Sequence, residues 1–128
     1  MEQKLAKHGM FSWFELQTTD VAAAKTFYSA LFGWKTEEMA MPGMPYTIIS
    51  AGGEQVAGMM AIPPQAQGMP PFWGVYVSVD DADVAAKKAQ QLGGAVIVAP
   101  TDIPTVGRFA VLKDPQGAMI TVMAYVKK

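Results

Sequence analysis

The chain has 128 residues, of which 51% are hydrophobic and 16% charged, with a formal net charge of −1. This length suits one domain with its own core, and the composition is typical of a compact soluble domain. Because no basic run is present, neither nucleic acid nor an anionic membrane is an expected partner. The absence of Cys excludes disulfides, thiolate metal ligands and a Cys nucleophile.

The first residues, "MEQKLAKHGMFSWF", lack the apolar stretch of a signal peptide, and no apolar run reaches the length of a membrane span. We therefore expect a cytoplasmic protein with no membrane partner. His8 is the one histidine and lies in a polar segment. We expect it on a solvated arm, because one histidine cannot build a His-rich metal site.

Residues 11–19, "FSWFELQTT", alternate with a period of two, which predicts a strand. The alternation divides the side chains between two faces: Phe14, Leu16 and Thr18 on one, and Trp13, Glu15 and Gln17 on the other. Asp20 is a suitable N-cap for a helix that Gly33 would end. Tyr28 in this helix is expected in the core.

The rest of the first half predicts a loop at 39–45, a strand at 46–50, a turn at 51–54 and a strand at 55–62. The loop carries Met39, Met41 and Met44, which we expect to cover the mouth of a binding cavity. Residues 63–71, "PPQAQGMPP", are rich in proline and predict a linker.

The pattern then repeats. Residues 73–79 alternate, Asp81 can cap a helix that ends at "GG", and a strand follows at 95–100. Residues 108–113 and 118–126 form a predicted hairpin around the turn "DPQG". The helix-ending glycine follows the capping Asp by 13 residues in the first half (Asp20 to Gly33) and by 12 in the second (Asp81 to Gly93).

The sequence therefore predicts an α+β fold in one domain, residues 1–128, built from two tandem βαβββ modules. Their expected bounds are about 9–62 and about 72–126, with the linker between them. One module is too small to bury both faces of its sheet. We expect the two to form one curved, eight-stranded mixed sheet with the helices outside and a concave cavity inside.

Three motifs resemble one family. "TTDVAAAKTFYSALFGW", "VSVDDADVAAKKAQQLGGAV" and "GRFAVLKDPQGAMITVM" are similar to the two helices and the last hairpin of the glyoxalase/bleomycin-resistance/dioxygenase group, the vicinal-oxygen-chelate superfamily. The resemblance extends from about Gly9 to Val126 and is strongest to single-domain members related to lactoylglutathione lyase. It implies a homodimer, because many relatives pair.

The resemblance also implies a divalent ion, which metal enzymes of this family hold with His, Glu or Gln side chains at four strand positions. The corresponding residues here are Trp13, Ala57, Gly74 and Thr121. None of them offers an imidazole or a carboxylate, the donors that such ions need. We therefore expect no metal and no other cofactor, and the resemblance does not decide whether the chain is an enzyme.

The expected cavity lining suits a small, partly apolar molecule held by a few polar contacts. Glu15 is the candidate catalytic residue, and the candidate ligand-binding residues are Trp13, Gln17, Tyr76, Arg108, Met119 and Thr121. Each has a plain alternative: Glu15 could pair with Arg108 in a structural ion pair, Arg108 could be a surface residue at a strand end, and Trp13 could be core packing.

Two functions remain open. The first is a metal-free protein that binds a small, partly apolar molecule in its concave cleft. The second is a glyoxalase-related enzyme, of lyase, isomerase or oxygenase type, that uses Glu15 as a general base or an ion bound elsewhere.

Overall fold

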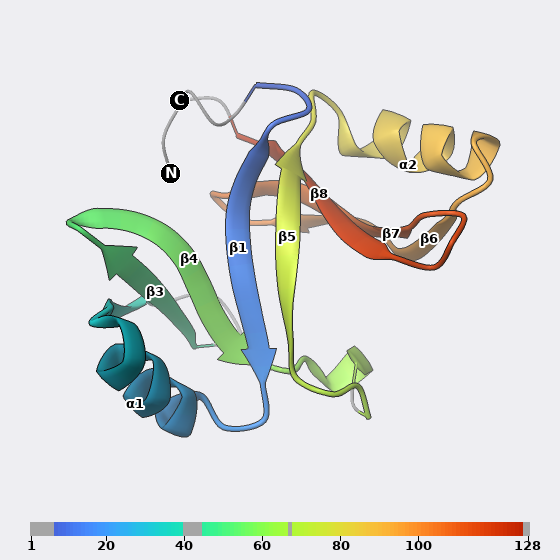
Figure 1. Ribbon diagram of the computed structural model, residues 1–128. Helices are drawn as coiled ribbons and strands as arrows, with labels where there is room; N and C mark the ends of the chain where they lie inside the picture. The colour runs from blue at the N-terminus through green and yellow to red at the C-terminus, as the bar shows by residue number, and fades with distance from the viewer. Residues whose placement is uncertain (1–6, 40–44, 67, 127–128) are drawn as a thin grey trace. The chain divides into compact units, whose positions relative to one another are not determined.

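The computed structural model describes residues 7–39, 45–66 and 68–126. Its elements follow one another as two βαβββ repeats joined by a short 3-10 turn, η2 (Pro64–Ala66) (Figure 1). The first repeat comprises β1 (Phe11–Thr18), α1 (Val21–Phe32), β2 (Lys35–Met39), β3 (Tyr46–Ala51) and β4 (Glu54–Ala61). The second comprises β5 (Phe72–Ser78), α2 (Ala82–Gln91), β6 (Ala95–Ile103), β7 (Gly107–Lys113) and β8 (Met119–Tyr125).

Hydrogen bonding orders the strands β2-β3-β4-β1-β5-β8-β7-β6 in an eight-stranded sheet. Each repeat has the same internal order, in which its last strand pairs parallel with its first and the other pairs are antiparallel. The sheet is therefore mixed, which confirms the α+β class and the tandem βαβββ architecture. The chain divides into two compact units, Trp13–Gly74 and a second unit formed by residues 75–126 together with the described residues before Trp13.

Helix α1 begins and ends where the sequence predicted. The side chain of Asp20 accepts a hydrogen bond from the Ala23 N–H at 3.0 Å, so it satisfies one of the unpaired donors of the first turn. Gly33 ends the helix with a φ of 74°, a left-handed conformation that glycine adopts without steric cost.

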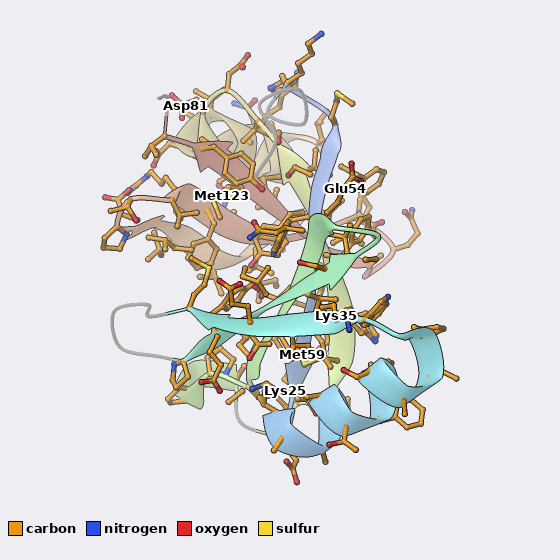
Figure 2. The ribbon with its side chains drawn as sticks, turned by 90° about the vertical axis from the view of Figure 1, so that its left-hand side faces the viewer. Lys25, Lys35, Glu54, Met59, Asp81 and Met123 are labelled. Carbon is orange, nitrogen blue, oxygen red and sulfur yellow. The ribbon has the colours of Figure 1, made fainter. Side chains whose placement is uncertain are left out.

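The core of the unit Trp13–Gly74 lies between α1 and one face of its strands. Leu16, Ile49, Ala57 and Met59 are its buried members, and Val21, Ala24 and Tyr28 of α1 pack against them. Met59, labelled in Figure 2, is fully buried there. The ring of Tyr28 also contacts those of Phe27, Phe32, Trp34 and Trp73, so the motif "FYSALFGW" forms an aromatic cluster on this helix.

Strand β2 is the element that sequence analysis did not place. All its residues are exposed, so it shows no alternation between a buried and a solvated face. It lies at one end of the strand order, and its charged side chains suit an edge strand that must not pair with another chain. Lys25 of α1 forms an ion pair with Glu38 of β2 at 2.9 Å, which fastens the helix to this edge.

The second unit has its own core, formed by Val79, Ala86, Ala110, Leu112 and Val122. Asp81 caps α2 by accepting from the Val84 N–H at 3.0 Å. The start of β1 belongs to this unit, because Ser78 of β5 bonds through its backbone to Gly9 and Met10.

The predicted "DPQG" turn joins β7 to β8. The Asp114 carboxylate accepts from the backbone N–H groups of Gln116 and Ala118 at 3.0 and 2.9 Å. Gly117 has a φ of 102°, which a residue with a Cβ rarely adopts. Of the methionine-rich loop expected over the cavity, residues 40–44 lie outside the described part of the chain. Within that part, neither helix is long and apolar enough to cross a membrane.

Candidate functional site

Three predicted site residues lie together on β1. Trp13 and Glu15 are each only 6% exposed, and Gln17 is half-buried. Leu16, between them in sequence, packs into the core under α1. The period of two therefore turns Trp13, Glu15 and Gln17 to the face of β1 opposite the helix, as the alternation predicted.

These side chains form a hydrogen-bonded chain with Tyr46, the first residue of β3. The indole Nε1–H of Trp13 donates to Tyr46 Oη at 2.8 Å, and Tyr46 Oη–H donates to Glu15 Oε2 at 2.8 Å. Gln17 Nε2 donates to Glu15 Oε1 at 3.3 Å. Each carboxylate oxygen of Glu15 thus has its own neutral donor, which fixes the plane of a group that is costly to bury without partners.

Tyr46 is a site residue that was not predicted from the sequence, and the signal that could have indicated it is Gly58. Strand β4 lies between β3 and β1, and Gly58 of β4 is directly opposite Glu15 in the parallel register. A Cβ built on Gly58 would collide with Oη and Cζ of Tyr46. An isolated glycine inside a strand often marks such a close approach, although it does not say which side chain approaches.

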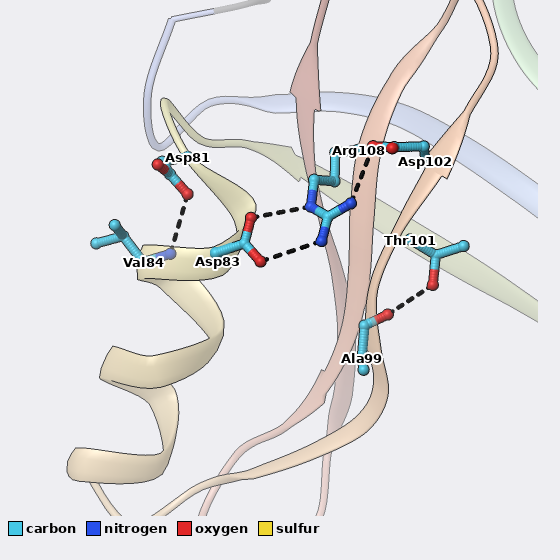
Figure 3. A network of polar contacts seen from close by, with 7 residues as sticks. All are labelled: Asp81, Asp83, Val84, Ala99, Thr101, Asp102 and Arg108. Atoms are coloured by element: carbon cyan, nitrogen blue, oxygen red, sulfur yellow. Dashed lines mark hydrogen bonds and ion pairs between the residues drawn. The ribbon is translucent and has the colours of Figure 1, made fainter.

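Arg108 of β7 lies in the second unit and binds two carboxylates of its own chain (Figure 3). Its Nε and Nη2 donate to the two oxygens of Asp83 on α2, at 2.9 and 3.2 Å, and its Nη1 donates to Asp102 of β6 at 3.0 Å. The carboxylates that Arg108 binds within its own unit are thus those of Asp83 and Asp102. With a side chain 38% exposed, Arg108 matches the alternative of a surface arginine.

The Asp83–Arg108 pair changes the ionisation of both groups. The hydrogen bond from Arg108 lowers the pKa of Asp83, and its positive charge acts in the same direction. The hydrogen bonds that Arg108 donates, to Asp83 first and to Asp102 second, raise the pKa of the guanidinium. Arg108 thus stays charged, and its Nε, Nη1 and Nη2 donors serve Asp83 and Asp102.

The remaining predicted ligand-binding residues also lie in the second unit. Tyr76 of β5 is directly opposite Thr121 of β8, so these two are neighbours on adjacent strands. Met119, at the start of β8, is 42% exposed and pairs with Lys113. His8 is 61% exposed, which agrees with the expected solvated position, and its Nδ1 accepts a hydrogen bond from the Asp80 N–H at 3.0 Å.

An open groove of about 490 Å³ lies at the end of the β6–β7 hairpin. Its lining includes Arg108, Thr105 and Tyr125, all in the second unit. The cationic side chain in this lining is Arg108, whose guanidinium is bound to Asp83 and Asp102. The groove is therefore a weaker candidate for a binding site than the hydrogen-bonded side chains of Trp13, Glu15, Gln17 and Tyr46.

The positions that the resemblance assigns to an ion do not fit one. Trp13 offers an indole N–H, which is a donor and no ligand, and Gly74 offers no side chain. The strand register corrects one of the four predicted ion-ligand positions. Tyr76 is paired with Thr121 in the second repeat, and Glu15 is paired with Gly58 in the first. The first-repeat counterpart of Thr121 is therefore Gly58 and not Ala57. Across residues 7–39, 45–66 and 68–126, no group of three His, Cys, Asp or Glu side chains could hold a metal.

Comparison with known proteins places this chain among larger relatives. It is 41% identical over 117 residues to CFP32 of Mycobacterium tuberculosis, a proposed glyoxylase, with 89% of this chain and 45% of the relative covered. It is 39% identical over 127 residues to the anthracycline biosynthesis protein DnrV of Streptomyces peucetius, covering 89% and 46%. The chain thus spans less than half the length of these curated relatives.

Solved structures share the fold at low sequence identity. The methylmalonyl-CoA epimerase of Mycobacterium tuberculosis has a TM-score of 0.67 at 14% identity, covering 99% of this chain and 94% of the other. A hypothetical protein of Bacillus halodurans, BH1468, has the same TM-score at 13% identity, covering 95% and 98%. The family model described as Glyoxalase/Bleomycin resistance protein/Dioxygenase superfamily matches residues 10–122. With this match over most of its length, the chain belongs to the glyoxalase/bleomycin-resistance/dioxygenase superfamily.

Proposed function

We propose that this chain binds a small, partly apolar molecule without a divalent ion, at the β1 face that carries Trp13, Glu15 and Gln17. The observation that supports this most is the Glu15 carboxylate, which is 6% exposed and held on both oxygens by neutral donors. A buried carboxylate costs stability, so its presence beside an indole and a phenol favours a role in recognition.

The chemistry of these groups indicates the kind of ligand. The buried Trp13 indole and the half-buried Tyr46 ring adjoin the Glu15 carboxylate, whose oxygens accept hydrogen bonds from Tyr46 and Gln17. A planar aromatic ligand with N–H or O–H groups suits this set better than an anionic one. The name of DnrV, an anthracycline biosynthesis protein, is consistent with an aromatic ligand.

Three probes with one ring and different charges test the proposal: benzamidine, benzamide and benzoate. The indole N–H signals of ¹⁵N-labelled protein would be followed during titration, each assigned by a Trp→Phe variant. We expect the Trp13 signal to respond, most to benzamidine and least to benzoate. Glu15→Gln should abolish this order, whereas Glu54→Gln, an exposed residue of β4, should keep it.

A response confined to the indoles of Trp34 and Trp73 would contradict the proposal. Both belong to the aromatic cluster around Tyr28, so such a result would place the binding of aromatic probes there. An order among the probes that Glu15→Gln leaves unchanged would likewise count against Glu15 as the recognising group.

A second candidate is a metal-free reaction of glyoxalase type with Glu15 as general base. The support is the buried carboxylate together with the glyoxylase name of CFP32. The assay uses the hemithioacetal of methylglyoxal and a thiol, with chelator present throughout. Turnover that falls at least about a hundredfold in Glu15→Gln would support this candidate, because a positioned general base contributes on that order. Turnover unchanged by Glu15→Gln would reject it.

A further inference from the structure

The geometry points to Tyr46 as the residue that positions the Glu15 carboxylate, and to Gly58 as the residue that makes room for it. This inference deepens the proposed function and rests on it for the ligand. Tyr46 acts through Glu15, so we assign it a positioning role and not a catalytic one.

The strand order explains how Tyr46 reaches Glu15. Strand β4 separates β3, which carries Tyr46, from β1, which carries Glu15. The Tyr46 side chain must therefore cross β4, and it does so at Gly58, the residue directly opposite Glu15. The phenol ends with Oη 2.8 Å from Glu15 Oε2 and 2.8 Å from Trp13 Nε1.

Only glycine at position 58 is compatible with this crossing. A Cβ there would collide with Oη and Cζ of Tyr46, so alanine would push the ring away from the carboxylate. Glycine inside a strand weakens the strand, because it has no side chain to pack and loses more conformational freedom on folding. The space that the Tyr46 phenol needs is a physical reason for glycine at this position.

The crossing also explains why an ion does not fit at this position. Gly58 is the counterpart of Thr121, a position where the resemblance implies an ion ligand. The Tyr46 phenol occupies the space that the Cβ of a ligand side chain at position 58 would need. In place of a ligand atom, the site presents a carboxylate whose plane is set by Tyr46 on one oxygen and Gln17 on the other. A fixed carboxylate selects ligands by their hydrogen-bond donors.

The first test needs no ligand. In protein labelled with ¹³C-glutamate, the side-chain carboxyl signal of Glu15 is the one that Glu15→Gln removes. We expect Tyr46→Phe, which keeps the ring but loses the O–H, to shift this signal at constant pH, and Gly58→Ala to shift it in the same direction. The matched control is Tyr125→Phe, which removes another phenol whose hydrogen bond, to Ser12, is also 2.8 Å long. A Glu15 signal that responds equally to both tyrosine variants would overturn the assignment.

A double-mutant cycle tests the role of Gly58. Gly58→Ala should lower the melting temperature in the wild-type background and have little effect in a Tyr46→Ala background, where no ring remains to collide with. If the two changes are additive, Gly58 does not serve Tyr46 and that part of the inference is wrong.

A third experiment repeats the titrations with benzamidine, benzamide and benzoate on the Tyr46→Phe variant. We expect the preference for benzamidine over benzoate to fall roughly tenfold, because the Glu15 carboxylate loses the hydrogen bond that sets its plane, and Tyr125→Phe to keep the wild-type preference. If no probe binds the wild type, the proposed function fails. The positioning role of Tyr46 is rejected separately, if Tyr46→Phe leaves the Glu15 carboxyl signal unchanged.

Discussion

At the scale of single residues, Glu15 shows how neutral donors can hold a buried carboxylate. Tyr46 and Gln17 each donate to a different oxygen. Glutamine at this position keeps one acceptor and its amide can rotate, so we expect Glu15→Gln to change the free energy of unfolding by about 1 kcal/mol or less. Glu15→Leu leaves two donors without their acceptor and should cost about 1–3 kcal/mol. Urea unfolding measures both, and equal losses in the two variants would contradict this account.

Asp83 provides a prediction on pH. Its pKa is lowered in the folded chain by the hydrogen bond from Arg108, so the ionised form favours folding. The stabilisation is fully present above the ordinary pKa of 3.8 and is lost as the pH falls through the lower folded value. The melting temperatures of wild type and Asp83→Asn should therefore differ at neutral pH and converge in strong acid.

The control for Asp83→Asn is Glu37→Gln, a charge change on the exposed strand β2. Because Asp83 and Arg108 are largely solvated, we also expect 1 M salt to reduce the difference at neutral pH. A difference that persists unchanged in acid would show that Asp83 acts by packing and not by its charge.

At the scale of elements, each helix depends on one capping aspartate. Asp20 and Asp81 have extended backbones and accept from the N–H three residues later at 3.0 Å. Alanine at either position should cost about 1 kcal/mol, the typical value of such a cap. Amide hydrogen exchange should become faster in the first turn of the affected helix only. Asp80→Ala, next to a cap but outside it, is the matched control, and an equal effect there would contradict the capping role.

At the scale of the whole molecule, we predict that the purified protein carries no stoichiometric divalent metal. The reason is the donor chemistry of Trp13, Gly58, Gly74 and Thr121, none of which supplies an imidazole or a carboxylate. Elemental analysis and melting with and without chelator are the measurements. About one tightly held Zn, Ni, Fe or Mn per chain, with a melting temperature that chelation lowers, would refute the prediction.

Elements with local signals could be predicted from the amino-acid sequence. Asp20 and Gly33 marked the ends of α1, and "DPQG" marked the β7–β8 turn, because caps and turns act through backbone groups within a few residues. The repeat of this pattern predicted two βαβββ modules, and the period of two placed Trp13, Glu15 and Gln17 on one face of β1. Strand β2 was not predicted, because an edge strand whose residues are all exposed shows no alternation of apolar and polar side chains.

The contacts between residues far apart in sequence could not be predicted in this way. Tyr46 reaches Glu15 across Gly58 because β4 lies between β3 and β1, and strand order leaves no trace in the spacing along the chain. Arg108 binds Asp83 and Asp102 for the same reason, because α2 packs on β6 and β7. Local signals come from neighbouring backbone groups, whereas contacts of side chains far apart in sequence depend on how the strands pair.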